Sequence, residues 1–144
     1  MLHIELSAGV AQLRDSATGV ALAEPAAVAI DGRSGLPFRA GWAALEHDRV
    51  IWPFEHLEQA AVDPDPEPRR CVLAHLVRTA LDRRPWWDRV LRPAVTLVVP
   101  ATLSPAAIQV IRGDAGFAGA ARNVRVEQRL RPGSGAVARH LGTD

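Results

Sequence analysis

The stretch from Ala94 to Pro100 constrains the fold of this chain more than any other. Its first six residues, Ala-Val-Thr-Leu-Val-Val, are apolar or β-branched without interruption, and Pro100 ends the run. Such a run is typical of a strand that is buried on both faces of its sheet, as in α/β proteins. The run therefore predicts a central strand.

Strand periodicity recurs on both sides of this run. The ranges that alternate or continue in extended, apolar-rich sequence are 2–6, 10–14, 20–30 with a break at Glu24-Pro25, and 123–130. Small or turn-forming residues separate the first three ranges. These three ranges predict a three-stranded antiparallel meander at the start of the chain.

Helices are expected between the later strands. Apolar residues from Arg69 to Leu81 are spaced to cover one helix face, and Ser104 can cap a helix that begins at Pro105 and continues to about Ala115. Short helices are also expected at 54–62 and 136–141, with a helical turn at 41–46. The order of strands and helices predicts an α/β fold with right-handed crossovers.

Length and composition bound the function. With 144 residues the chain fits one domain, and a formal net charge of +1 argues against general electrostatic binding of nucleic acid. The one cysteine, Cys71, cannot form an internal disulfide, so we expect a buried structural thiol in a cytoplasmic protein. The first residues have no basic segment leading into an apolar stretch, and no apolar run approaches about 18 residues, so we expect neither secretion nor a transmembrane anchor.

Two segments, 2–31 and 91–128, carry a specific combination of motifs. The third strand contains Glu-Pro-Ala-Ala-Val-Ala-Ile from Glu24 to Ile30, and the later strand ends in Val99-Pro100 before a helix, an Ala-Gly-Ala turn and another strand. In these features the chain resembles the MreB family of bacterial actins. The resemblance implies a ribonuclease H-like mixed sheet, a meander plus parallel strands with flanking helices, as in actin-like subdomain IA, with 1–144 as a single truncated actin-like domain.

The resemblance also implies a phosphate loop after the first strand, in which a carboxylate lies near a metal and a glycine and a hydroxyl cradle phosphate. The matching positions here are Glu5, Ser7 and Ala8, so the acid is longer, the glycine has gained a side chain and the hydroxyl is absent. In the later strand, Glu127 and a glutamine stand where the family has two acids, and Arg129 replaces a proline. We expect a vestigial site, whose space Arg129 could occupy through a salt bridge with Glu5 or Glu127.

These departures predict no bound cofactor, no metal and no ATP hydrolysis by the chain itself. The family's second lobe is expected to be absent, and its smaller outer subdomain nearly so, because the region from Ile30 to Arg49 is short. The expected function is a non-enzymatic scaffold or adaptor that binds a protein complex, an actin-like filament, a membrane-associated assembly or itself. Two alternatives stay open: one lobe of a split ATPase completed by another subunit, and a peripheral adaptor at the inner membrane.

Other constellations are weak. The five histidines and Cys71 lack the spacing of a metal site, and neither Ser7 nor Ser104 has a signature of nucleophilic activation. Glu5 and Glu127 could form a carboxylate pair, but we expect two solvated acids. Trp42 and Trp52 are expected to cover the core.

Trp86 and Trp87 stand in a predicted loop, flanked by the arginines Arg83, Arg84 and Arg89. Adjacent side chains point in different directions, so at least one ring should be exposed. In the MreB family, the loop at this place carries in some members an apolar pair that enters the membrane. Contact with a protein partner, contact with a membrane and packing against the chain's own helices all remain open.

Overall fold

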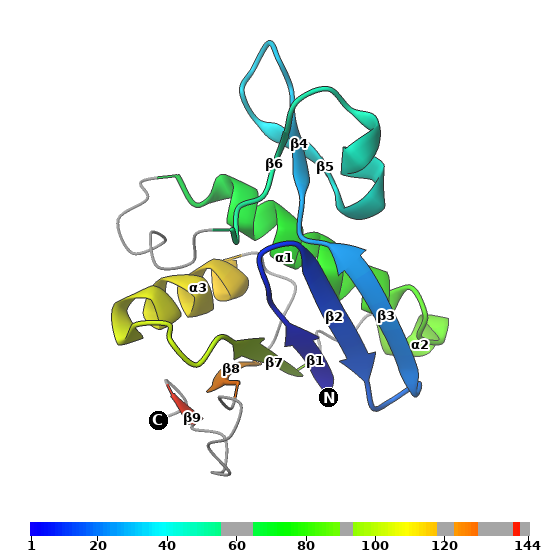
Figure 1. Ribbon diagram of the computed structural model, residues 1–144. Coiled ribbons are helices and arrows are strands. Elements are labelled where there is room, and N and C mark those ends of the chain that lie inside the picture. Colours follow the sequence, from blue (N-terminus) through cyan, green and yellow to red (C-terminus); the bar gives the residue numbers. More distant parts are fainter. Residues whose placement is uncertain (56–64, 90–93, 118–122, 130–139, 142–144) are drawn as a thin grey trace.

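The computed structural model describes residues 1–55, 65–89, 94–117, 123–129 and 140–141 (Figure 1). Its main sheet has six strands in the order β3-β2-β1-β7-β8-β9. Their bounds are Leu2–Glu5 (β1), Val10–Asp15 (β2), Val20–Pro25 (β3), Ala94–Val99 (β7), Asn123–Gln128 (β8) and His140–Leu141 (β9). The first three strands form the expected antiparallel meander, and β7 and β8 continue it in parallel beside β1. The predicted ribonuclease H-like mixed sheet is confirmed.

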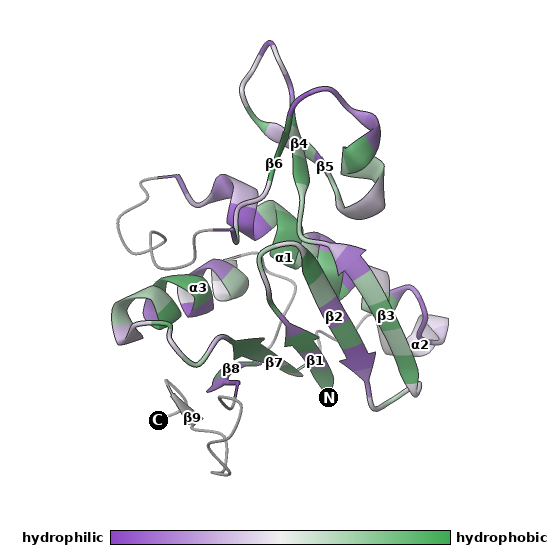
Figure 2. Cartoon of the chain, viewed as in Figure 1, coloured by the Kyte–Doolittle hydropathy of each residue, from purple (hydrophilic) through white to green (hydrophobic). Residues whose placement is uncertain are grey.

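Strand β7 is central, as its sequence predicts. It pairs with β1 on one side and with β8 on the other, and Val95, Leu97 and Val99 are buried. Figure 2 shows apolar residues along β7, along β4 and in the middle of α1. An uninterrupted apolar strand is stable in this position because both of its edges are paired and little of it meets water.

Two long helices pack on this sheet. Helix α1 (Glu67–Leu81) contacts β1 and β2, helix α3 (Pro105–Phe117) contacts β8, and the two helices contact each other. The predicted cap is present, since the Ala107 amide donates to the Ser104 hydroxyl at 3.2 Å. No helix in the described part of the chain is long and apolar enough to cross a membrane.

A second, smaller sheet stands beside the main one (Figure 1). It consists of β4 (Val28–Ile30), β5 (Pro37–Ala40) and β6 (Val50–Ile51) in the order β5-β4-β6, and the 3-10 helix η1 (Gly41–Glu46) follows β5. A small core of Ala27, Ala29 and Ala44 supports it. The expectation that the outer region is nearly absent is therefore wrong, because alanines let a short hairpin pack closely.

The range 20–30 is divided rather than continuous. β3 ends at Pro25, and β4 then pairs in the small sheet instead of extending the meander. Proline at the junction cannot donate to a further ladder bond, which favours a change of sheet at this point.

Two further expectations on secondary structure need correction. The prediction of a final helix over 136–141 is wrong for its last two residues, because His140–Leu141 is a strand that pairs antiparallel with Val126 and Glu127. The rest of that predicted helix, 136–139, lies outside the described residues. The predicted helix at 54–62 falls mostly on 56–62, which also lie outside them. In addition, the tryptophan pair is not in a loop but in the short helix α2 (Trp86–Arg89).

Candidate functional site

The vestigial phosphate-loop positions gather at one edge of the main sheet, where β1, β7 and β8 end. Glu5 pairs in register with Val98, and Val98 pairs with Glu127, so the two acids lie in one row on opposite sides of β7. Neighbouring strands are about 4.8 Å apart, which separates the two Cα atoms by roughly 10 Å. The acids therefore share an edge, but their backbones are not adjacent.

Arg129 lies just after β8 and turns toward β1. Its Nη2 atom is 2.7 Å from the Glu5 carboxylate and 3.4 Å from the Leu6 carbonyl oxygen, and its amide donates to the Val99 carbonyl at 2.6 Å. Of the two acids that Arg129 could bridge, Glu5 is the partner, so the expectation that Glu5 is simply a solvated acid is wrong. Both side chains are partly exposed, so this bridge contributes no more than about 1 kcal/mol to stability.

The turn between β1 and β2 holds the other two loop positions. The Ser7 hydroxyl donates to the Val10 carbonyl and accepts from the Val10 amide at 3.3 Å, so the turn itself uses this side chain. Ala8 is exposed and offers only a methyl group. The Gly9 carbonyl accepts from the Ala26 amide at 2.9 Å, which ties the turn to the junction of the two sheets.

The second family acid is replaced by Gln128, which has a structural role here. Its side-chain amide is buried and donates to the Leu103 carbonyl at 2.9 Å, linking β8 to the segment before α3. Within the described residues, no group of three or more His, Cys, Asp or Glu side chains is placed to hold a metal ion.

The tryptophan pair in α2 is the most exposed apolar feature of the described structure. Trp86 is 74% exposed and Trp87 is 62% exposed, and their rings meet edge to face with centroids 5.9 Å apart. Neither ring is part of the core of the described structure, so packing against the chain's own helices is not their role here. Contact with a partner or with a membrane remains open.

Arg84 was expected beside the tryptophans as a surface cation, and this prediction is wrong. The side chain is buried and forms two hydrogen bonds with Asp15, at 2.8 Å and 3.0 Å. A buried Asp needs a partner, and the end of α1 brings Arg84 next to the end of β2. Arg83 remains exposed, and Arg89 is the last residue of α2.

The environment of Asp15 explains how this pair is held. Burial by itself raises the pKa of Asp15. Hydrogen bonds from Arg84 and the Ala17 amide, together with the charges of Arg84 and the N-terminal amino group, lower this pKa by more than burial raises it. The net effect is that the Asp15 pKa lies below its usual value. A second buried pair, Arg69 and Asp114 at 2.5 Å, joins α1 to α3.

The remaining tryptophans and the cysteine differ in their positions. Trp52 packs against the small core, as expected, whereas Trp42 is 61% exposed and its indole donates to the Ala23 carbonyl at 3.3 Å. The tight 3-10 turn directs Gly41 and Ala44 inward and leaves Trp42 outside. Cys71 is half-buried, and burial raises the pKa of its thiol.

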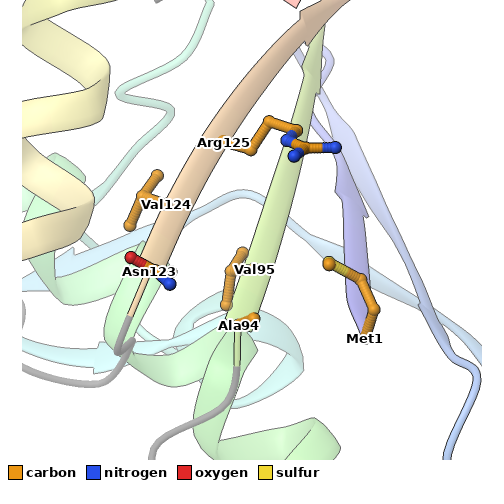
Figure 3. A pocket seen from close by; sticks show the side chains of 6 residues that line it. All are labelled: Met1, Ala94, Val95, Asn123, Val124 and Arg125. Atoms are coloured by element: carbon orange, nitrogen blue, oxygen red, sulfur yellow. The ribbon is translucent and has the colours of Figure 1, made fainter. Parts of the chain in front are cut away.

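A pocket of about 270 Å³ lies at the other end of the parallel strands, where β7 and β8 begin (Figure 3). Met1, Val95, Val124 and Arg125 are among its lining residues. Met1 is fixed there, because its amino group donates to the Ser16 hydroxyl at 2.7 Å and its sulfur accepts from the Thr96 hydroxyl at 3.2 Å. This pocket is separate from the edge that holds Glu5 and Arg129.

Comparisons with known proteins show the fold. A structure of a non-polymerising mutant of MamK bound to AMPPNP superposes with a TM-score of 0.66 at 15% identity, covering 88% of this chain and 40% of that one. The chain has an actin-like fold. Structures of MreB5 of Spiroplasma citri bound to AMPPNP and to ADP give TM-scores of 0.61 and 0.62, each at 20% identity over 88% of this chain and 38% of that one.

This actin-like chain thus spans about two fifths of the length of each of these structures. No family model and no curated protein matches the sequence. The structural likeness agrees with the resemblance in the two motif segments. It supports the expected architecture of the sheet and leaves activity to be argued from the residues.

Proposed function

We propose that this actin-like chain is a non-enzymatic scaffold or adaptor that neither binds nor hydrolyses ATP by itself. The observation that carries this proposal is the ion pair between Arg129 and Glu5, with 2.7 Å between Nη2 and Oε1. It fixes a positive charge at the edge where the resemblance implies a carboxylate near a metal.

The chemistry of divalent cations supports the proposal. Magnesium in nucleotide sites is held by carboxylates, waters and substrate phosphates. Here the carboxylate of Glu5 already binds a guanidinium, which would repel a divalent cation at the same place. Ser7 is engaged by its own turn and Ala8 has no hydroxyl, so two further groups of a phosphate loop are lost.

Titration calorimetry of the chain with magnesium and ATP tests this proposal. We expect no micromolar binding and no release of phosphate above background, and micromolar binding would overturn the proposal. The variant Arg129→Ala frees Glu5, whereas Arg125→Ala removes an exposed arginine from β8, the strand that precedes Arg129, without touching Glu5. If the ion pair is what excludes the metal, only the first variant should gain affinity for magnesium.

The scaffold role needs a contact surface, and the exposure of Trp86 and Trp87 favours α2. Tryptophan and arginine are enriched among residues that dominate protein interfaces, and Arg83 is exposed close to the pair in sequence. Because Arg84 is committed to Asp15, the surface has one cation fewer than the sequence suggests. This loss favours a protein partner over an anionic membrane.

Affinity purification of the tagged chain from its own cells, compared with a Trp86→Ala/Trp87→Ala variant, tests this surface. We expect a specific partner that the double variant loses. Sedimentation with anionic liposomes is the second arm, and pelleting that depends on the two tryptophans would assign the surface to lipid instead. A partner retained equally by both proteins would remove α2 from the interface.

A further inference from the structure

A second pocket of about 270 Å³ lies between the small sheet and the long helix. Strand β5 and helix η1 form one side of it, and helix α1 forms the other. Phe38, Arg39 and two alanines line it from β5 and η1, and residues of α1 line it from below. The α1 residues are spaced three or four apart from Cys71 to Arg78, so they share one face of the helix. The pocket is therefore built by elements that are far apart in sequence.

The charged groups at this pocket are all basic. Arg39 comes from β5 and Arg78 from α1, His75 of α1 also lines the pocket, and no acidic residue is among the lining residues. Among the described residues, no acidic side chain forms an ion pair with Arg39 or Arg78. Glu24 is outside the lining, and its carboxylate lies 3.8 Å from His75 Nε2 and accepts from the Trp42 amide at 3.4 Å. Two guanidinium groups are thus left to face an incoming ligand.

The rest of the lining is apolar and small. Alanines 40, 43 and 74 leave room because their side chains are short, and the Phe38 ring borders the same space. The Phe38 ring is held edge to face by His47, with centroids 4.7 Å apart. Apolar walls with a few polar groups are typical of small-molecule sites, and this volume lies just below the roughly 300–1,000 Å³ of drug-sized ligand pockets, which suits a small ligand.

We propose that this pocket binds a small organic anion, with a carboxylate or phosphate group between Arg39 and Arg78 and an apolar body against Phe38 and the alanines. Guanidinium groups suit both anions, because their planar donors match carboxylate and phosphate oxygens. This inference is independent of the proposed scaffold function, since no residue at the Glu5–Arg129 edge takes part.

Cys71 supplies a built-in probe, because it is the only cysteine in the sequence and it lines the pocket. The rate at which N-ethylmaleimide labels it can be followed while phenyl phosphate, benzoate or inorganic phosphate is added. At a ligand concentration ten times its Kd, mass action slows labelling about tenfold when bound ligand covers the thiol. We expect saturable protection by the two organic anions, weaker protection by inorganic phosphate, and none by benzyl alcohol.

Two charge-matched variants separate the pocket from the general charge of the protein. Arg39→Gln/Arg78→Gln should lose the protection, whereas Arg14→Gln/Arg33→Gln removes two exposed arginines elsewhere and should keep it. Whether benzoate or phenyl phosphate protects at lower concentration then identifies the preferred anion. Absence of protection by both organic anions, or equal protection in both double variants, would overturn the proposal.

A second measurement does not depend on finding the right ligand. Iodoacetate is an anion and iodoacetamide is neutral, and both alkylate the same thiolate. We expect the rate with iodoacetate, divided by the rate with iodoacetamide, to fall in Arg39→Gln/Arg78→Gln because the positive charges are removed. The same ratio should fall with added salt, because salt screens the attraction between the arginines and iodoacetate. A ratio unchanged by the loss of both arginines would contradict a positive pocket.

Discussion

The carboxylate of Asp15 and the guanidinium of Arg84 form a buried, two-pronged ion pair, although the two residues are 69 positions apart in the sequence. Asp15 ends β2, and Arg84 lies between α1 and α2, with only Pro85 separating it from the first residue of α2. The pair therefore connects the meander to the segment that presents Trp86 and Trp87. It removes two charges from the surface at once and fixes where the tryptophan pair stands.

Breaking this pair should be costly. Arg84→Ala leaves Asp15 buried without its partner, and changes of this type destabilise proteins by about 3–5 kcal/mol. The adjacent Arg83 is exposed, so Arg83→Ala is a matched control with an expected change below about 0.5 kcal/mol. Urea unfolding followed by circular dichroism measures both, and equal small effects would show that the buried pair does not stabilise the fold.

The same pair makes stability depend on pH. The Asp15 pKa is lower in the folded protein than its ordinary value, so the unfolded chain binds the proton first as the pH falls. The stabilisation is complete above the unfolded pKa of about 3.9 and is lost as the pH falls through the folded pKa. The free energy of unfolding should therefore decrease in acid.

Asp15→Asn should flatten this acid dependence when urea midpoints are compared from about pH 5 to about pH 3. The slope should not vanish, because hydrogen bonds from the Arg33 amide and the Ser34 hydroxyl also lower the pKa of Asp31. Identical slopes for the parent chain and Asp15→Asn would show that another group dominates.

Gly41 is required by both its backbone and its neighbours. Its φ is +71°, and a Cβ there would lie 2.4 Å from His75 Nε2 and 2.7 Å from Glu24 Oε2. Gly41→Ala should cost more than the roughly 1 kcal/mol of a left-handed alanine, because the added Cβ also displaces the ends of the His75 and Glu24 side chains. Gly35 has the same φ and open space around it, so Gly35→Ala isolates the backbone cost of about 1 kcal/mol. Thermal or urea unfolding that finds equal losses would contradict the packing argument.

The tryptophan pair should matter little for stability. Trp86→Ala/Trp87→Ala removes two exposed rings, and we expect a loss below about 1 kcal/mol. Phe54 is 1% exposed, and Phe54→Ala should cost about 3–5 kcal/mol as a core truncation. Urea unfolding compares the two variants. A large loss in the double variant would mean that the rings belong to the fold rather than to a contact surface.

Periodicity predicted the main sheet because it is a local property of the chain. The alternation in β1 and β2, the apolar run of β7 and the Ser104 cap all depend on residues a few positions apart, and each formed where expected. The small sheet was missed because its strands are short. Pro37–Ala40 carries no alternation that a sequence pattern could detect, and its pairing comes from β4.

The sequence predicted one of the two candidate sites and gave no sign of the other. The Glu5–Arg129 ion pair was expected because the resemblance placed the ends of β1 and β8 near each other. The pocket beside Cys71 had no such signal, since Arg39 and Arg78 come from different elements and neither stands in a motif. Arg84 was misassigned because a sequence cannot show which of two neighbouring arginines is buried.

By itself, the sequence determined the strands of the meander, the central strand and the two long helices, since these follow from side-chain spacing along the chain, while the mixed character of the main sheet came from the resemblance. Only the tertiary structure revealed the buried pairs of Arg84 with Asp15 and of Arg69 with Asp114, and it selected Glu5 over Glu127 as the partner of Arg129. The reason is physical. A buried charge is stable only when an opposite charge lies close to it. The distance between two charged groups in the folded chain is set by packing rather than by their separation in the sequence.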